Sequence, residues 1–399
     1  MHMADALISP AVGGTMLAAT AGVAAYSVRK IQNDIDEKKI PLMGVMGAFV
    51  FAAQMINFSI AGTGSSGHLA GGMLLAVILG PYAGFLTMAS VLLIQALFFA
   101  DGGLLAFGCN VFNLGFYTCF IVYPLIYKRL TRKGINSGRI FAASILSSII
   151  GLQLGAFSVV LETLLSGKTE LPFSAFLMLM LPIHLAIGIV EGLITSAVVV
   201  FVWKARPEII ESSYKGKEIV EGFFPGKEII GSSSAEKEII ERFSPEEENT
   251  DTSSPGKSYG NVPMKKVLVS FIIAAVIIGG VLSWFASSNP DGLEWSILKV
   301  TGGTEPEITN SEPETSNTVH KVLSEIQEKI AFFPDYEFKA DDSVTEKSGG
   351  LSDEEETWPA VSAETSVSGL VGGALTLALC VFIGLIIGLV KKKKMRKAV

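Results

Sequence analysis

The chain has 399 residues, of which 49% are hydrophobic and only 17% are charged, and its mean hydropathy is +0.49. A soluble globular protein carries roughly a quarter charged residues, so this composition excludes an ordinary soluble domain. The net charge of −7 arises mostly between Asn289 and Glu364, and no basic surface with interleaved aromatic residues is present. We therefore expect an all-α polytopic membrane protein with lipid around it and no nucleic-acid partner.

Seven apolar segments within residues 1–203 are expected to span the membrane as a helical bundle. The third segment, 69–79, is too short to cross a bilayer core of about 30 Å, because a helix rises about 1.5 Å per residue. Irregular backbone buried in protein, or a thinned bilayer, is therefore expected around it. The seven segments are 11–28, 41–60, 69–79, 82–100, 107–127, 140–165 and 172–203.

Basic residues predict the orientation of these segments. The loops between spans alternate between the two sides of the membrane. The loops on one side are rich in Lys and Arg, whereas Lys168 is the single basic residue in the loops on the other side. Because cytoplasmic loops are enriched in these residues, Met1 is expected outside the cell membrane. The stretch before the first span has no basic residue, which favours an uncleaved first helix over a secretory signal. The basic residues of the expected inner loops are Arg29, Lys30, Lys38, Lys39, Lys128, Arg129, Arg132, Lys133, Arg139, Lys204 and Arg206.

A polar segment, 204–263, follows the seven spans. It repeats Glu-Ile-Ile or Glu-Ile-Val every ten residues, which predicts a loosely ordered cytoplasmic linker, with a docking segment as the alternative. Its Gly256-Lys257-Ser258 matches the end of a nucleotide-binding loop, but Asp251 stands where that pattern requires glycine. We therefore expect neither an ATPase nor another enzyme activity in this chain.

The last part of the chain, 264–399, contains two further spans, 267–286 and 370–390, with an acidic segment between them. Lysines before the first and after the second of these spans predict a cytoplasmic C-terminus and an acidic segment outside. Within that segment, 317–333 has the apolar spacing of an amphipathic helix.

Two of the four histidines are candidate metal ligands. The amine of Met1 and the amide nitrogen of His2 would close a five-membered ring on a metal, and the same amide with His2 Nδ1 would close a six-membered ring. His68, beside a glycine-rich loop on the same expected outer face, would add a fourth nitrogen. Such a site suits Ni(II) or Cu(II) and argues against Mg or Ca, but it does not separate these metals from Co(II) by affinity alone.

Other polar residues within or beside the spans are candidates for supporting roles, because polar groups in a membrane are costly. Gln95, Asn110 and Asn113 would orient His68 or bond neighbouring helices. His184 and Glu191 lie two turns apart on one helix face, and each is expected to pair with a neighbouring helix; a direct metal role for His184 is the alternative. Ser65, Ser66 and the neighbouring glycines are expected to shape the loop around His68 and to allow close helix packing.

Short segments in order along residues 1–203 carry a family resemblance. They read MHMADALISP, GTGSSGHLAGG, LGPYAG, LLIQALFFADGG, FGCNVFNLG and HLAIGIVEGLIT. They resemble the NikM/CbiM family, the substrate-binding membrane components of energy-coupling-factor nickel and cobalt importers. The later run Asn289-Pro290-Asp291-Gly292-Leu293-Glu294-Trp295 resembles the small N component of the same systems. The chain therefore resembles a fused M–N protein.

This resemblance implies that Met1, His2 and His68 hold a transported Ni(II) or Co(II), which is a substrate and not a resident cofactor. It implies two partners, a transmembrane coupling protein (T or Q) and a cytoplasmic ABC-type ATPase (O), and it favours nickel by analogy. Ala6 stands where the family often has glycine, which bears on the local turn and not on the ligands. In the N motif, Asp291 and Glu294 would bind a passing cation or, as we prefer, form a turn that packs.

Three other functions are open at this point. The first is a cobalt importer that feeds cobalamin synthesis. The second is a stand-alone secondary transporter, which would need ionisable groups deep in the bundle such as Glu162 and Glu191; uptake that survives without a partner ATPase would favour it. The third, an enzyme of cobalamin synthesis, has no catalytic constellation behind it.

Overall fold

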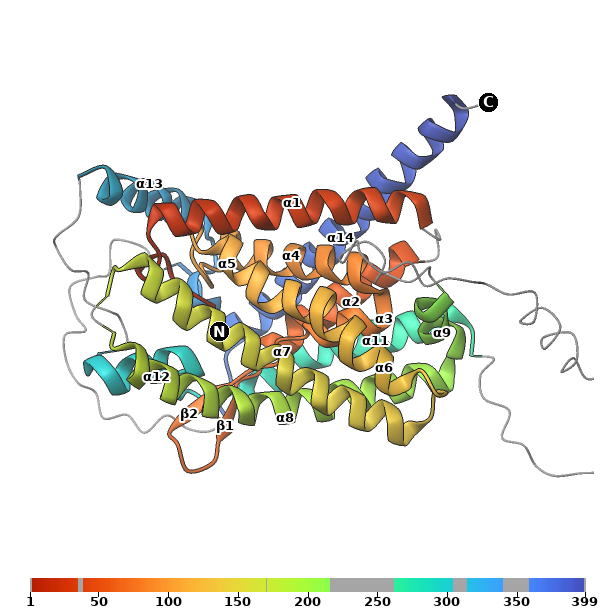
Figure 1. Cartoon of the computed structure of the whole chain (residues 1–399), viewed down its shortest axis with the longest axis horizontal. Helices are drawn as coiled ribbons and strands as arrows, with labels where there is room; N and C mark the ends of the chain where they lie inside the picture. Colours follow the sequence, from red (N-terminus) through yellow and green to blue (C-terminus); the bar gives the residue numbers. More distant parts are fainter. Residues whose placement is uncertain are drawn as a thin grey trace, which may run out of the picture.

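A computed structural model of the chain describes residues 2–34, 39–169, 171–215, 262–303, 314–339 and 359–397. Within these residues the chain is almost entirely helical, and the long helices run side by side as a bundle (Figure 1). Large apolar side chains such as Phe141, Leu185 and Phe201 are exposed on the outside of the bundle, where a bilayer would cover them. The expected class, an all-α polytopic membrane protein, is confirmed.

The first part of the chain begins with the 3-10 turn η1 (Asp5–Leu7) and contains most of the helices. They are α1 (Pro10–Asp34), α2 (Lys39–Gln54), α3 (Gly72–Leu79), α4 (Pro81–Phe98), α5 (Phe107–Val111), the π-helix η2 (Phe112–Tyr127), α6 (Lys128–Thr131), α7 (Ser137–Ser166), α8 (Phe173–Ala205) and α9 (Pro207–Lys215).

The last part of the chain adds further helices to the bundle and to one of its ends. They are α11 (Met264–Gly280), η4 (Leu282–Phe285), α12 (Gly292–Thr301), α13 (Glu314–Ile330), η5 (Pro334–Tyr336) and α14 (Ala363–Lys397).

Six helical segments among the described residues are long and apolar enough to cross a membrane. They are Pro10–Gln32, Pro81–Phe98, Phe107–Thr131, Ser137–Ser166, Phe173–Ala205 and Ala363–Lys393, while α2 is apolar but shorter. The expected total of seven plus two spans stays a prediction. The division into a metal-binding domain, a linker and an N unit also stays a prediction. Met1 and the linker repeats from residue 218 onwards lie outside the described residues.

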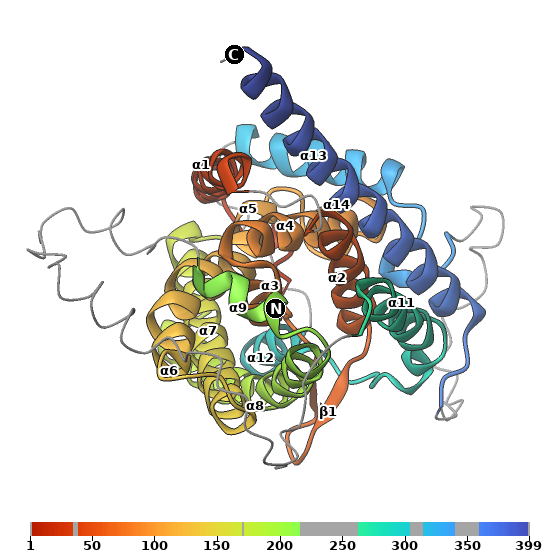
Figure 2. The ribbon, with the colours of Figure 1, turned by 90° about the vertical axis from the view of Figure 1, so that its right-hand side faces the viewer.

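Helix α3 lies at the centre of the bundle, and all of its residues are buried (Figure 2). The helix before it, expected to run to residue 60, ends at Gln54. The strand β1 (Phe58–Ile60) then pairs antiparallel with β2 (Ser65–Gly67), and glycines with φ of 79° and 73° at Gly62 and Gly64 form the turn between them. Strand β2 is buried throughout, so the short third segment is extended by irregular backbone that protein surrounds, as expected.

Helices α11 and α14 pack against α2, so the last part of the chain completes one side of the bundle (Figure 2). Helix α11 ends at Gly280, earlier than the expected residue 286, because two consecutive glycines weaken the helix and one 3-10 turn follows. Helix α14 continues beyond 370–390 in both directions, and the Lys-rich run at its end, made of good helix formers, extends it to Lys397.

Candidate functional site

His2 and His68 lie together at one end of the bundle, although 65 residues separate them in the chain. Their rings stack with centroids 5.1 Å apart and planes 26° apart. His2 belongs to the extended start of the chain, and the next residue, Met3, is completely buried. His68 directly follows the buried strand β2. The end of the bundle that carries these two rings, together with the β1–β2 hairpin, is called the site end below; α6 and α9 lie at the opposite end (Figure 1).

Asn110 fixes the backbone next to His2. Its Oδ1 accepts a hydrogen bond from Met3 N at 2.8 Å, and its Nδ2 donates to Met3 O at 3.2 Å. Gly103 N also donates to Met3 O, at 2.9 Å. Asn113 lies deeper: its Nδ2 donates to Glu162 Oε2 at 2.8 Å and lies 3.9 Å from Met3 Sδ. Both asparagines therefore act on the segment that follows His2, and neither contacts His68 through a hydrogen bond within the described residues.

Asp101, in the loop after α4, is the hydrogen-bond partner of the His2 ring. His2 Nδ1 lies 2.7 Å from Asp101 Oδ1, and the Tyr336 hydroxyl donates to Asp101 Oδ2 at 2.6 Å. Burial by itself would raise the pKa of Asp101, but the charge and hydrogen bond of His2 and the hydrogen bond of Tyr336 lower it below its usual range. Burial and the Asp101 charge raise the pKa of Tyr336. Asp101 is therefore a carboxylate and Tyr336 a proton donor near neutral pH.

Gln95 approaches this group from the bundle. Its Nε2 donates to Gln54 Oε1 at 3.0 Å and to the Tyr336 hydroxyl at 3.3 Å. Gln95 thus bonds to Gln54 on α2 and to Tyr336, in agreement with the expected alternative of a bond between neighbouring helices. Neither Asp101 nor Tyr336 was predicted from the sequence to lie at the site. A charge at the end of an apolar span was a usable signal for Asp101, whereas nothing in the sequence pairs it with a tyrosine 235 residues away.

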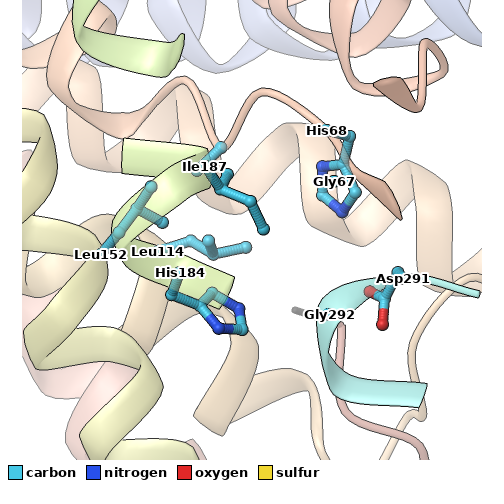
Figure 3. A pocket seen from close by; sticks show the side chains of 9 residues that line it. Gly67, His68, Leu114, Leu152, His184, Ile187, Asp291 and Gly292 are labelled. Atoms are coloured by element: carbon cyan, nitrogen blue, oxygen red, sulfur yellow. The ribbon is translucent and has the colours of Figure 1, made fainter. Parts of the chain in front are cut away.

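A pocket opens beside His68. Figure 3 shows His68, His184 and Asp291 around it, each from a different element, with apolar side chains between them. Its lining residues are Gly67, His68, Ala70, Leu114, Leu152, His184, Ile187, Asp291 and Gly292.

The two pocket histidines each have one nitrogen bound to a backbone carbonyl. His68 Nδ1 lies 3.2 Å from Leu69 O, and His184 Nδ1 lies 2.8 Å from Met180 O. A carbonyl only accepts, so each Nδ1 carries the proton and each Nε2 keeps its lone pair. Burial lowers the pKa of His68 to about 3, so the ring is neutral near pH 7. His184 Nε2 is buried without a hydrogen-bond partner among the described residues.

Glu191, two turns after His184, supports the other side of the pocket. Its Oε2 accepts a hydrogen bond from Ala70 N at 2.9 Å, so it holds the segment that follows His68. Within the described part of the chain, no three His, Cys, Asp or Glu side chains are arranged to share one metal ion.

The β1–β2 hairpin connects His68 to the N motif. Ser66 N donates to Pro290 O at 2.8 Å, and Ser66 Oγ donates to Asn289 O at 2.7 Å. Trp295 Nε1 donates to Thr63 O at 3.0 Å. The strand that ends beside His68 is thus bonded directly to the residues before Asp291.

Within the motif, Asp291 is the N-cap of α12. Its Oδ1 accepts from Leu293 N at 2.7 Å and from Glu294 N at 2.9 Å, while Glu294 Oε2 accepts from Asp291 N at 3.1 Å. This reciprocal capping box explains the Asp-Gly-Leu-Glu spacing. The short helix packs on α8 with Gly292 against Ile183 and His184.

Comparison with known proteins places this arrangement in a family. Residues 2–209 match the family model described as the cobalt uptake substrate-specific transmembrane region, CbiM. The chain belongs to the CbiM family. Residues 265–389 of this CbiM-family chain match a second model, the PDGLE domain. The expected resemblance to a fused M–N protein is therefore confirmed.

Two relatives of this CbiM-family chain are fused proteins. A putative fused nickel transport protein NikMN of Archaeoglobus fulgidus is 36% identical over 53% of this chain and 68% of its own length. A probable fused nickel transport protein LarMN of Lactiplantibacillus plantarum is 33% identical over 52% of this chain and 66% of its own length. A solved structure of a truncated transition metal transporter has 31% identity, covers 51% of this chain and 98% of its own, and gives a TM-score of 0.45.

Proposed function

We propose that this chain captures Ni(II), or Co(II), at the site end for import across the cell membrane. The observation that carries the proposal is the stacking of the His2 and His68 rings, at 5.1 Å, beside the start of the chain. Family membership and the names of the fused nickel transport relatives support the metal class. Nickel is the preferred cargo by analogy with the relatives that are named fused nickel transport proteins.

The proposed ligands are the Met1 amine, the His2 amide nitrogen, His2 Nδ1 and His68. The first three close fused five- and six-membered rings, and the neutral His68 ring offers Nε2 without first losing a proton. Clamping of Met3 by Asn110 supports this assignment, because it holds the chelating segment in place before a metal arrives. The His184 ring, across the pocket, is proposed to line the site without binding the metal.

Transport is proposed to use partners that this chain does not supply. We infer that a coupling membrane protein and a cytoplasmic ABC-type ATPase provide the energy, with the site end outside the cell and the C-terminus in the cytoplasm, as the basic loops indicate. The opposite end, where α9 packs against α3 and α8, is the proposed docking side, because α3 begins four residues after His68 and so links the His68 segment to α9.

A stand-alone secondary transporter is the competing proposal. Its two candidate acids, Glu162 and Glu191, both accept hydrogen bonds that fix local structure, from Asn113 and from the Ala70 backbone. Nickel uptake by cells that express the chain with and without the coupling protein and ATPase separates the two. Undiminished uptake without the ATPase would exclude the energy-coupling-factor proposal.

The metal site is tested with purified protein that has a native N-terminus. One Ni(II) per chain should bind, with the absorption spectrum of a planar, nitrogen-rich complex. Acetylation of Met1, His2→Ala and His68→Ala should each abolish tight binding, whereas His320→Ala, a matched histidine change on α13, should not. Tight binding that persists in all three altered proteins would exclude these ligands. Competition between Ni(II) and Co(II) in the same assay determines the cargo.

A further inference from the structure

The His2 ring is already engaged in this structure, and by the same atom that the chelate needs. Nδ1 lies 2.7 Å from Asp101 Oδ1. An imidazole nitrogen has one in-plane position, which holds either a proton or a lone pair for a metal. The hydrogen bond to Asp101 and a bond to the metal therefore exclude each other at this atom.

Asp101 is held in place by the PDGLE unit (265–389). Tyr336 of that unit donates to Asp101 Oδ2 at 2.6 Å, so the carboxylate has one oxygen on Tyr336 and the other on His2. The tyrosine is itself anchored on both sides. Its ring stacks on Phe99 with centroids 5.0 Å apart, and its carbonyl accepts a hydrogen bond from Ser368 on α14 at 2.8 Å.

The backbone around Tyr336 is strained. Asp335 and Tyr336 have φ values of 51° and 65°, a left-handed conformation that is rare for a bulky side chain. The conformation is maintained by tertiary contacts, among them hydrogen bonds from Phe333 N to Phe98 O at 3.1 Å and from Asp335 N to Phe99 O at 2.9 Å. Such strain gathers where a fold must hold a group in one position. Here that group is the Tyr336 hydroxyl.

We propose that Tyr336 and Asp101 form a latch that holds His2 in a metal-free orientation, so that the PDGLE unit controls metal loading. This inference rests on the proposed metal site. Loading requires the His2–Asp101 hydrogen bond to break and Nδ1 to give up its proton, so that the Nδ1 lone pair can face the metal. Nε2 is buried and has no hydrogen-bond partner among the described residues, so no other bond is lost there.

With such a latch, the apparent affinity equals the intrinsic affinity multiplied by the fraction of molecules in which the latch is open. Tyr336→Phe removes the hydroxyl and keeps the ring that stacks on Phe99. The variant should load Ni(II) faster and bind it more tightly by roughly 10-fold, the effect of losing one hydrogen bond to a charged group. The dissociation rate and the absorption spectrum of the bound metal should not change, because the ligands are the same.

The experiment measures Ni(II) association, dissociation and equilibrium binding in full-length protein with a native N-terminus. Tyr26→Phe, in the last third of α1, is the matched control, because its ring packs edge-on against Tyr82 with centroids 5.8 Å apart and not against residues of the site. Two more proteins complete a double-mutant cycle: the single variant Asp101→Asn, and the double variant that carries both Asp101→Asn and Tyr336→Phe. Since the hydroxyl acts through the carboxylate, the Tyr336→Phe effect should disappear when Asp101 is replaced.

The outcomes are distinct. Weaker or unchanged Ni(II) binding by Tyr336→Phe, in a protein whose wild type needs His2, would overturn the latch and leave the metal site intact. An effect of Tyr336→Phe that persists in the Asp101→Asn background would also overturn it. Failure of the wild type to bind Ni(II), or full binding by His2→Ala, would instead refute the proposed function.

Discussion

Single side chains at the site end act on the backbone of the first residues as much as on the proposed metal ligands. Asn110 uses both atoms of its amide to hold Met3, one as acceptor and one as donor. Asp5 Oδ1 accepts from Ala106 N at 2.9 Å and ties the next turn to the same loop. These bonds fix the direction in which the chain leaves His2, and the proposed chelate, which uses backbone atoms, requires such a fixed direction.

Asn110→Ala is therefore expected to weaken Ni(II) affinity by about 10- to 100-fold, the usual loss when a group that orients a ligand is removed. Equilibrium dialysis of purified protein measures the effect. Asn136→Ala is the control, because Asn136 caps α7 through Arg139 N at 2.9 Å, at the opposite end of the bundle. Equal affinity for both variants would show that the Met3 clamp plays no part in binding.

Among the secondary-structure elements, α12 and the β1–β2 hairpin set the wall of the pocket. The hairpin bonds to the residues before α12, and α12 packs on α8, so the three elements hold His68, His184 and Asp291 around one space (Figure 3). The approach of α12 to α8 is close at Gly292. A Cβ there would lie 2.6 Å from Ile183 Cγ2 and 3.2 Å from His184 Cε1.

Gly292→Ala should therefore destabilise the protein by about 1 kcal/mol, because overpacking at this contact outweighs the helix preference of alanine. The midpoint of thermal unfolding in detergent reports the change. Gly22→Ala on α1 serves for comparison, since nothing lies within 4 Å of a Cβ at that position, and it should be neutral or stabilising. A Gly292→Ala protein as stable as Gly22→Ala would contradict the close packing of α12.

In the whole molecule, the PDGLE unit is part of the bundle and of its site end. Helices α11 and α14 cover α2, with Phe271 packed edge-on against Phe49 at 5.2 Å, while Tyr336 and the N motif reach the site from two directions. The unit thus contacts the first part of the chain through both apolar surface and specific hydrogen bonds.

A chain divided within the linker, into residues 1–240 and 241–399, should therefore reassemble when the two pieces are co-expressed. Affinity purification through a tag at the C-terminus of the second piece should recover the first piece in equal amount, with Ni(II) binding retained. Tyr336→Phe in the second piece should leave assembly unchanged, because the apolar contacts remain. Recovery of the second piece alone would contradict a shared bundle.

Much of this protein could be read from its sequence. Hydropathy and charge identified a helical membrane protein, because the bilayer accepts only apolar segments with satisfied backbone groups. Helix positions followed from the same pattern. The family was recognised from short segments that resemble NikM/CbiM proteins, and the candidate ligands His2 and His68 came from chelate geometry and that resemblance. The capping spacing of Asp291 and Glu294 is also local, so a turn at the N motif was predictable.

Only the tertiary structure decided how these parts meet. Helical periodicity gives the apolar face of a segment but not the helix that covers it, so the placement of α3 at the centre could not be derived. The contact of Asp101 with Tyr336 joins residues 235 positions apart and leaves no local pattern. The same holds for the contact of Ser66 with Asn289. Composition and short-range spacing therefore determined the kind of molecule and its candidate ligands, whereas long-range packing decided that the PDGLE unit contacts the site end and that Asp101 bonds to His2.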